Sequence, residues 1–197
     1  MPRGVAVCFA CATFPTWNAW PAMLASLATG NAVIVKPHPS AILPMALTVR
    51  TCRRVLGEAG FPPDLVTLCV DDAADPVGKR LVKHPLAAIV DFTGSARFGA
   101  WVEANAHPAL CFSETSGVNT VVVESVETLE PVLRSLATTM SLFSAQMCTS
   151  PQNVYVPREG ILCGGRRMGA DEFGAALATA IGAIAGDPKR AAPIMAA

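Results

Sequence analysis

Short apolar runs alternate along this chain with longer stretches whose apolar residues recur at helical spacing. The runs predict strands over residues 4–12, 32–35, 65–70, 87–92, 118–123 and 154–156. The longer stretches predict helices over residues 20–29, 40–59, 76–83, 95–106, 129–144 and 173–185, with Ser40 and Ser95 as caps. Strands that are apolar at successive positions are typical of a parallel sheet buried on both faces. The sequence therefore predicts an α/β fold in which helices cover a parallel sheet.

The composition is unusually apolar. Hydrophobic residues make up 52% of the chain and charged residues 15%, and the mean hydropathy is +0.43. Either membrane insertion or a large share of buried residues would explain these values. The longest apolar stretches, residues 4–14 and 173–185, are shorter than the ~20 residues that span a bilayer. The 15 basic and 15 acidic residues cancel and form no basic stripe. We therefore expect a chain made mostly of protein interior, with neither a membrane nor a nucleic acid as partner.

The seven cysteines are odd in number and follow no regular spacing, so they indicate a reducing, cytoplasmic setting without disulfides. Phe14-Pro-Thr-Trp-Asn18 stands where a secretory signal would have a small-residue cleavage site, which argues against such a signal. Cys8-Phe-Ala-Cys11 matches the CxxC pattern inside a predicted strand, where positions three apart face opposite sides. Since no second pair completes a zinc site, we interpret both cysteines as core residues and expect no metal.

Both ends of the sequence look incomplete. The chain begins directly in a strand and stops in an alanine-rich tail after residues 184–188, so we interpret it as an excerpt truncated at both ends. Residues 158–167, with three glycines and several charges, look the most flexible. A domain boundary is expected between residues 123 and 132, where strand–helix pairs give way to a long helix, and we place it after residue 125.

Cys148 lies between a predicted helix and a predicted strand, in Gln146-Met-Cys-Thr149. A thiol at the end of an element, with backbone N–H groups nearby to receive an oxyanion, suits a nucleophile. The commoner role of a single cysteine is that of a small buried hydrophobe. Glu114, flanked by Ser, Thr and Gly, adds a carboxylate that can activate water to release a thioester from the sulfur. Together the two residues favour nucleophilic catalysis with a general base.

Two further segments suit a nucleotide. In Asp91-Phe-Thr-Gly-Ser95, free N–H groups at a helix start attract a phosphate, and Gly94 would let it approach closely. An ordinary strand-to-helix turn explains these residues equally well, and the G-x-G-x-x-G fingerprint of common dinucleotide sites is absent. Lys36 follows a buried strand, at the sheet edge where ligands bind, and its ammonium group suits ribose hydroxyls or an adenosine phosphate. A solvated lysine at a strand end is the simpler alternative.

The remaining aromatic and imidazole side chains indicate structure more than chemistry. His38, His84 and His107 share no spacing and each precedes a proline, so we interpret them as loop or cap residues. Trp17 and Trp20 are three apart near a helix start, and we expect them to pack instead of forming a substrate cage.

The motifs gain specificity from their order. Phe14-Pro15, Gly30 to Pro37, Gly60-Phe-Pro-Pro63, Phe92-Thr-Gly-Ser95, Glu114-Thr-Ser-Gly117 and Gln146-Met-Cys-Thr149 follow one another along nearly the whole chain. This succession closely resembles the aldehyde dehydrogenase superfamily. Within it, Lys36-Pro-His-Pro39, Gly117-Val-Asn-Thr-Val-Val122 and Gln146 to Asn153 look most similar to the phenylacetate-degradation subgroup.

The resemblance implies roles for particular residues. Cys148 would be the nucleophile, Glu114 the general base, and Thr13 would stand where the family usually has an asparagine that donates to the oxyanion. Lys36 would contact the adenosine ribose, with Gly94 and Ser95 under the pyrophosphate. The other residues implied in cofactor binding are Phe98, Gly99 and Thr115. Because His38-Pro39 displaces the usual acidic or small polar residue, the choice between NAD and NADP stays open.

The resemblance also implies a Rossmann-like sheet, with residues 1–125 as the central part of an NAD(P)-binding domain and residues 126–197 as the start of a catalytic domain. The activity implied is NAD(P)-dependent oxidation of an aldehyde, a semialdehyde from phenylacetate or other aromatic-acid breakdown, through a thioester on Cys148. A homo-oligomer is implied for the full-length protein. Two alternatives stay open: coenzyme A as acyl acceptor, and a truncated, non-catalytic module that only binds nucleotide or a protein partner.

Overall fold

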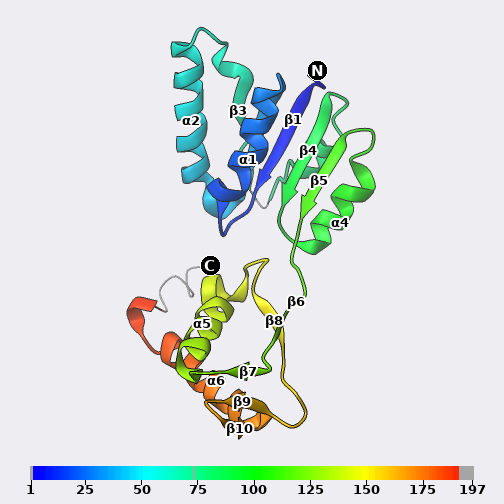
Figure 1. Ribbon diagram of the computed structural model, residues 1–197. Coiled ribbons are helices and arrows are strands. Elements are labelled where there is room, and N and C mark those ends of the chain that lie inside the picture. The colour runs from blue at the N-terminus through cyan, green and yellow to red at the C-terminus, as the bar shows by residue number, and fades with distance from the viewer. Residues whose placement is uncertain (1, 73, 191–197) are drawn as a thin grey trace. The chain divides into compact units, whose positions relative to one another are not determined.

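The computed structural model describes residues 2–72 and 74–190, so the alanine-rich tail over 191–197 lies outside the described residues. The chain divides into two compact units, Met1–Thr115 and Ser116–Ala197 (Figure 1). We call the first unit 1 and the second unit 2.

A parallel sheet forms the centre of unit 1, as the apolar runs predicted. Its strands are β1 (Val5–Ala10), β2 (Ala32–Pro37), β3 (Val66–Leu68), β4 (Ala87–Thr93) and β5 (Leu110–Glu114), arranged in the order β3-β2-β1-β4-β5. Strand β1 pairs in parallel with both β2 and β4, so it lies in the middle of the sheet. The order reverses beside β1, which creates the switch point where open α/β sheets bind ligands.

Helices cover both faces of this sheet. They are α1 (Pro15–Ala28), α2 (Ile42–Glu58), α3 (Gly78–Val82) and α4 (Ala96–Asn105), with short 3-10 turns at Pro39–Ala41 and Pro63–Leu65. Alternate residues of β1 point to opposite faces of the sheet. Ala6, Cys8 and Ala10 pack with α1 and α2. Val7 and Phe9 pack with α3 and α4 on the opposite face. The small side chains of the first set leave room for Met23 of α1 and Met45 of α2.

Some boundaries in unit 1 differ from those predicted. Helix α1 begins at Pro15, not at residue 20, because proline is favoured in the first turn, where its missing N–H is not needed. Ser40 does not cap α2: its N–H donates to Nδ1 of His38 at 3.1 Å, and Ala41 precedes the helix. Ser95 caps α4 as predicted, accepting from the N–H of Phe98 at 3.4 Å. Strand β5 was not predicted, because an edge strand that alternates exposed and half-buried residues forms no apolar run.

Unit 2 combines two small sheets with two helices. Strands β6 (Asn119–Val122) and β8 (Pro151–Tyr155) pair in parallel, and a second sheet has the order β10-β9-β7. The members of the second sheet are β7 (Ser125–Val126), β9 (Ile161–Cys163) and β10 (Arg166–Met168). Helices α5 (Leu129–Ser141) and α6 (Ala170–Ala185) share one core with these strands, formed by Leu136, Ala137, Ile161, Phe173 and Leu177 among others.

Two predictions in unit 2 were wrong. The stretch 158–167 is not a flexible loop, because β9 and β10 pair antiparallel across Gly164 and Gly165. These glycines have φ of 53° and 85°, the left-handed values that a tight two-residue hairpin turn requires. The helix predicted to reach residue 144 ends at Ser141, and a short turn, Leu142–Ala145, follows.

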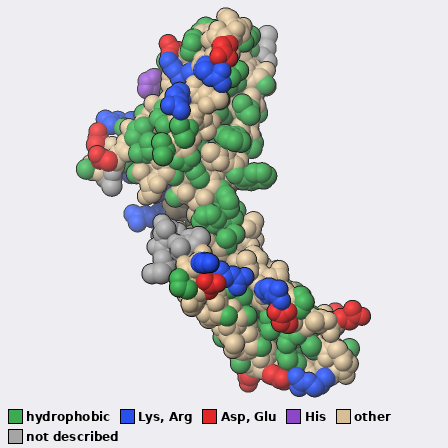
Figure 2. Space-filling model, turned by 90° about the vertical axis from the view of Figure 1, so that its left-hand side faces the viewer, with side chains coloured by type: hydrophobic (Ala, Val, Ile, Leu, Met, Phe, Trp, Pro, Cys, Tyr) green, Lys and Arg blue, Asp and Glu red, His purple; other side chains and the backbone are tan. Residues whose placement is uncertain are grey.

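Several large hydrophobic side chains remain at the surface of unit 1. Trp17 is 77% exposed and Trp20 46% exposed, so the prediction that both are packing residues was wrong. Trp20 instead donates from Nε1 to Oγ1 of Thr48 at 3.2 Å. Figure 2 shows hydrophobic side chains at the surface on the side of α2, where Leu43 and Leu47 are exposed. Of the helices that the described residues form, none has the length and hydropathy needed to traverse a bilayer.

Candidate active site

The carboxyl edge of the unit 1 sheet gathers most of the predicted site residues. Lys36 lies near the end of β2, and Glu114 is the last residue of β5. Thr13 follows β1, and Gly94 with Ser95 follows β4, so these three flank the switch point. Parallel strands bring their carboxyl ends to one edge, and ligands of open α/β sheets bind there. The sheet therefore brings together residues that lie far apart in the sequence.

Glu114 is held from two directions. Its backbone oxygen accepts from the N–H of Gly94 at 3.1 Å, next to the pairing of Thr93 with Glu114 in the sheet. Its side-chain Oε2 accepts from Nδ2 of Asn18, on α1, at 3.5 Å. The carboxylate is exposed, so water can reach it. These contacts suit a base that must be both fixed and accessible.

Cys11 connects the turn after β1 to this carboxylate. Its thiol lies 3.1 Å from Oδ1 of Asn18 and 3.6 Å from Oγ1 of Thr13. The N–H of Phe14 donates to the same sulfur at 3.4 Å. A thiol that donates to Oδ1 leaves the amide Nδ2 of Asn18 directed at Glu114. The core interpretation of the CxxC pattern therefore holds for Cys8, which is 1% exposed, but is wrong for Cys11, which lies beyond the strand.

Asp91 adds a second carboxyl group to this region. It lies on β4, opposite Phe112 of β5, two residues before the end of the strand. Burial and, to a lesser degree, the charge of Glu114 raise the pKa of the Asp91 carboxyl to about 6. Desolvation favours the neutral acid, and a nearby carboxylate adds to that effect. Asp91 therefore changes charge close to neutral pH.

The glycines near the start of α4 are required by packing. A Cβ on Gly94 would lie 2.6 Å from Cζ of Phe92, and one on Gly99 would lie 2.4 Å from Cγ2 of Thr115. Phe98 stacks on Trp101 and meets Phe9 and Phe92 edge to face, so its ring belongs to the core. Contact of these residues with a pyrophosphate stays a prediction.

Lys36 is not the solvated lysine of the simpler alternative. It is 8% exposed, forms an ion pair with Asp71 and donates from Nζ to the carbonyl oxygen of Pro37 at 3.0 Å. His38, two residues on, has a pKa lowered first by burial and then by the charge of Lys36. A charged lysine is thus held at the sheet edge, with a carboxylate as its partner.

Cys148 lies in unit 2, in the turn before β8, and its side chain belongs to an exposed residue. Nδ2 of Asn119, on β6, donates to the carbonyl oxygens of Cys148 and of Ser150, the latter at 3.2 Å. Just upstream, Phe143, Ser144 and Ala145 have φ of 50°, 56° and 60°. Such left-handed values are strained for residues other than glycine and concentrate at functional sites. Cys148 is thus an exposed residue whose own carbonyl oxygen is held by Asn119. The backbone just before it, at residues 143–145, is strained.

Three residues in unit 1 escaped the sequence analysis: Asn18, Asp71 and Asp91. Asp71 and Asp91 lie at or just after predicted strands, which is a weak positional signal. Asn18 meets Glu114 from 96 positions away, so nothing local marks it.

A sequence model of the aldehyde dehydrogenase family matches residues 1–181. The 1-pyrroline-5-carboxylate dehydrogenase of Bacillus licheniformis is 31% identical over 79% of this chain and 31% of its own length. The 3-succinoylsemialdehyde-pyridine dehydrogenase of a Pseudomonas species is 30% identical over 79% of this chain and 32% of its own length. The chain thus spans about a third of the curated relatives that it matches.

Solved structures of aldehyde dehydrogenases are also similar to this chain. An NAD-dependent aldehyde dehydrogenase from Burkholderia multivorans superposes with a TM-score of 0.88 at 47% identity, covering 96% of this chain and 34% of that one. Betaine aldehyde dehydrogenase from Staphylococcus aureus, solved with NAD+, gives a TM-score of 0.74 at 22% identity over 93% of this chain and 34% of that one, and supports the fold alone. With the family model matching most of its length, this chain belongs to the aldehyde dehydrogenase family.

Proposed function

We propose that the protein oxidises an aldehyde to the acid with NAD or NADP, through a thioester on Cys148. The observation that carries the proposal is the exposed thiol of Cys148, in a chain of this family whose sheet edge also presents Glu114. Residues 1–125 serve the cofactor and residues 126–197 contribute the nucleophile. The full-length protein assembles as a homo-oligomer.

The chemistry assigns one step to each group. The Cys148 thiolate adds to the carbonyl carbon, and the new oxyanion accepts a hydrogen bond, with Thr13 as a donor. NAD or NADP, when bound, accepts the hydride that leaves this carbon. Glu114 then removes a proton from a water molecule, which attacks the thioester and releases the acid and the thiol. Water thus supplies the second oxygen of the acid.

The cofactor suits the residues at the sheet edge. Lys36 and Ser95 lie beside the switch point, and the remaining N–H groups at the start of α4 suit a pyrophosphate. Lys36 holds the adenosine ribose, and the backbone around Gly94 and Ser95 lies under the phosphates. Phe98, Gly99 and Thr115 shape this part of the site.

The substrate proposed is a semialdehyde from phenylacetate or related aromatic-acid breakdown. Support comes from Lys36-Pro-His-Pro39, Gly117 to Val122 and Gln146 to Asn153, the motifs that suggest the subgroup. The relatives described above are named for other aldehydes. Turnover of a panel of aromatic, pyridine-linked and aliphatic aldehydes tests the choice, and product analysis with and without coenzyme A identifies the acyl acceptor.

The test of the reaction compares wild type with Cys148→Ala and with Cys163→Ala as a matched control. Aldehyde-dependent formation of reduced nicotinamide should vanish in Cys148→Ala and persist in Cys163→Ala. Turnover at the parent rate in Cys148→Ala would overturn the proposal.

A non-catalytic, nucleotide-binding or interaction module is the second candidate. It is favoured by the exposed hydrophobic residues of unit 1, such as Trp17 and Leu43, which suit burial against another protein segment. Nucleotide binding without turnover by the 197-residue chain would support it.

A further inference from the structure

Lys36 and Asp71 form a buried ion pair in unit 1, with side chains only 10% and 3% exposed. The N–H of Cys69 donates to the carbonyl oxygen of Val35 at 2.9 Å, so the chain that leaves β3 runs directly beside Lys36. Oδ2 of Asp71 accepts from the N–H of Val77 at 2.9 Å. The carboxylate is thus fixed from two sides, by an ammonium group and by the backbone.

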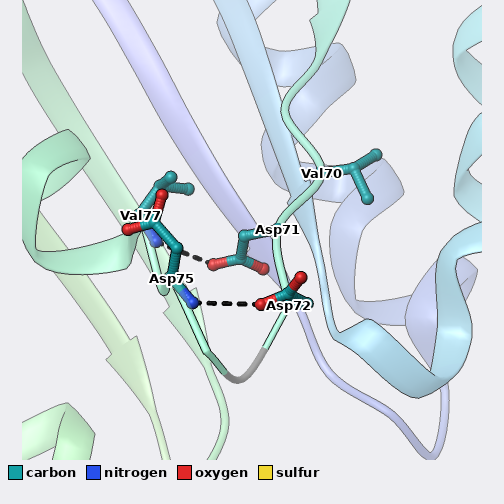
Figure 3. A pocket seen from close by; sticks show the side chains of 5 residues that line it. All are labelled: Val70, Asp71, Asp72, Asp75 and Val77. Atoms are coloured by element: carbon teal, nitrogen blue, oxygen red, sulfur yellow. Dashed lines mark hydrogen bonds between the residues drawn. The ribbon is translucent and has the colours of Figure 1, made fainter.

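A pocket of about 440 Å³ opens beside this pair and is lined by Val70, Asp71, Asp72, Asp75 and Val77 (Figure 3). Asp72 keeps its Oδ1 engaged with the N–H groups of Ala74 and Asp75, at 2.7 and 3.0 Å. Three carboxylates therefore border the pocket, and the residues that line it include no cation. The potential in the pocket is negative.

The neighbouring basic groups offset only part of this charge, because two cations pair with three carboxylates. Arg80 pairs with Asp75 at 3.2 Å, and Lys79 lies 5.2 Å above the ring of Trp101. Burial and then the charge of Lys36 lower the pKa of His38, which favours its neutral form, while the charge of Asp71 acts in the opposite direction. Lys36 itself is neutralised by Asp71.

We infer that Asp71 makes the protein select NAD over NADP. The inference rests on the proposed function, in which Lys36 contacts the adenosine ribose. A ribose 2′-hydroxyl can donate to a carboxylate, whereas a 2′-phosphate needs an unpaired cation. Here a 2′-phosphate would meet a pocket that keeps a net negative charge, with Asp72 bonded, among the described residues, only to backbone N–H groups, and a lysine whose charge is already compensated by Asp71. Like charges at such range repel.

Binding of two adenosine nucleotides to the 197-residue chain tests the inference without turnover. Isothermal titration with adenosine 5′-monophosphate and with adenosine 2′,5′-bisphosphate isolates the effect of the 2′-phosphate. We expect the monophosphate to bind tighter by about tenfold or more, and Asp71→Asn to reduce that ratio toward one or reverse it. Asp64→Asn, which removes the exposed partner of Arg53, should leave the ratio unchanged.

The outcomes distinguish the inference about Asp71 from the proposed function on which it rests. Equal or tighter binding of the bisphosphate to wild type would overturn the inference while leaving nucleotide binding intact. Binding of neither nucleotide would overturn the proposed function and the inference with it. The wild-type ratio is decisive even if Asp71→Asn, which leaves Lys36 buried without a counter-charge, fails to fold. A folded Asp71→Asn with the wild-type ratio would remove Asp71 as the cause.

Discussion

Asn18 donates from Nδ2 to Oε2 of Glu114, and its own Oδ1 lies 3.1 Å from the thiol of Cys11. The amide therefore has one face directed at the carboxylate and the other at the sulfur. Glu114 ends an edge strand, where its exposed side chain would otherwise be free to rotate. Asn18 restrains that carboxylate without burying it.

Asn18→Ala should slow thioester hydrolysis in the proposed reaction by about three- to tenfold, because one hydrogen bond to a charged group is lost. Formation of the thioester, measured as the burst of reduced nicotinamide, should be nearly unchanged. The control is Thr48→Ala, which removes the hydrogen bond from Trp20 without touching Glu114. Equal slowing of burst and steady state would show that the amide does not act through the base.

Asp91 should make the free energy of unfolding depend on pH. Because the pKa of this carboxyl is about 6 when folded and near 3.8 when unfolded, the folded state holds the extra proton between these values. Its contribution to stability is therefore complete below the unfolded value and is lost as pH rises through 6. Asp91→Asn should stabilise the protein above pH 6 by about 1 kcal/mol, since solvent screens part of the effect.

Urea unfolding of wild type and Asp91→Asn on both sides of pH 6 measures this difference. Asp64→Asn, an exposed surface carboxylate, is the matched control. A constant difference between wild type and Asp91→Asn across the range would contradict the prediction.

Gly99→Ala should destabilise unit 1 by about 1–3 kcal/mol, the usual cost of overpacking. The new Cβ would lie 2.4 Å from Cγ2 of Thr115 and 3.3 Å from Cε1 of Phe92. Thr115→Ser removes the closer methyl group, so the cost of Gly99→Ala should be smaller in that background. Gly174→Ala, on α6 with open space around it, should instead stabilise its helix by up to about 1 kcal/mol. Chemical unfolding measures the free energy of unfolding of wild type, Gly99→Ala, Thr115→Ser, the double variant and Gly174→Ala. An equal cost of Gly99→Ala in the wild-type and Thr115→Ser backgrounds would exclude the Thr115 contact as its cause.

The thiols should differ sharply in reactivity. Burial, with a smaller effect of Asp91, raises the pKa of Cys8 to about 12, so almost no thiolate forms there at neutral pH. Cys148 is exposed. Brief treatment with iodoacetamide, followed by peptide mass spectrometry, should find Cys148 modified and Cys8 unmodified until urea is added. Early labelling of Cys8 would contradict the packing of β1.

The central strands could be predicted because β1, β2 and β4 are apolar on both faces. The edge strand β5 could not, because exposed Leu110 and Phe112 alternate with less exposed residues in a pattern that also suits a loop. The hairpin at Gly164-Gly165 carried the right turn signal, but charges at Arg166 and Arg167 suggested a loop. Placing Lys36 at the carboxyl edge followed from the predicted parallel sheet, whereas the position of Glu114 depends on β5, which was not predicted. Their partners, Asp71 and Asn18, depend on how loops and helices pack, which local sequence does not encode.

The alternation along β1 has a consequence for how this chain can vary. Deleting one codon between Val5 and Phe9 would move Phe9 to the opposite face of the central strand, into the place of Cys8, where α1 and α2 leave room only for a small side chain. The same deletion would draw Cys11 back toward the sheet, away from its contact with Asn18. We therefore expect homologous genes to differ in this strand by substitution and to keep its length constant.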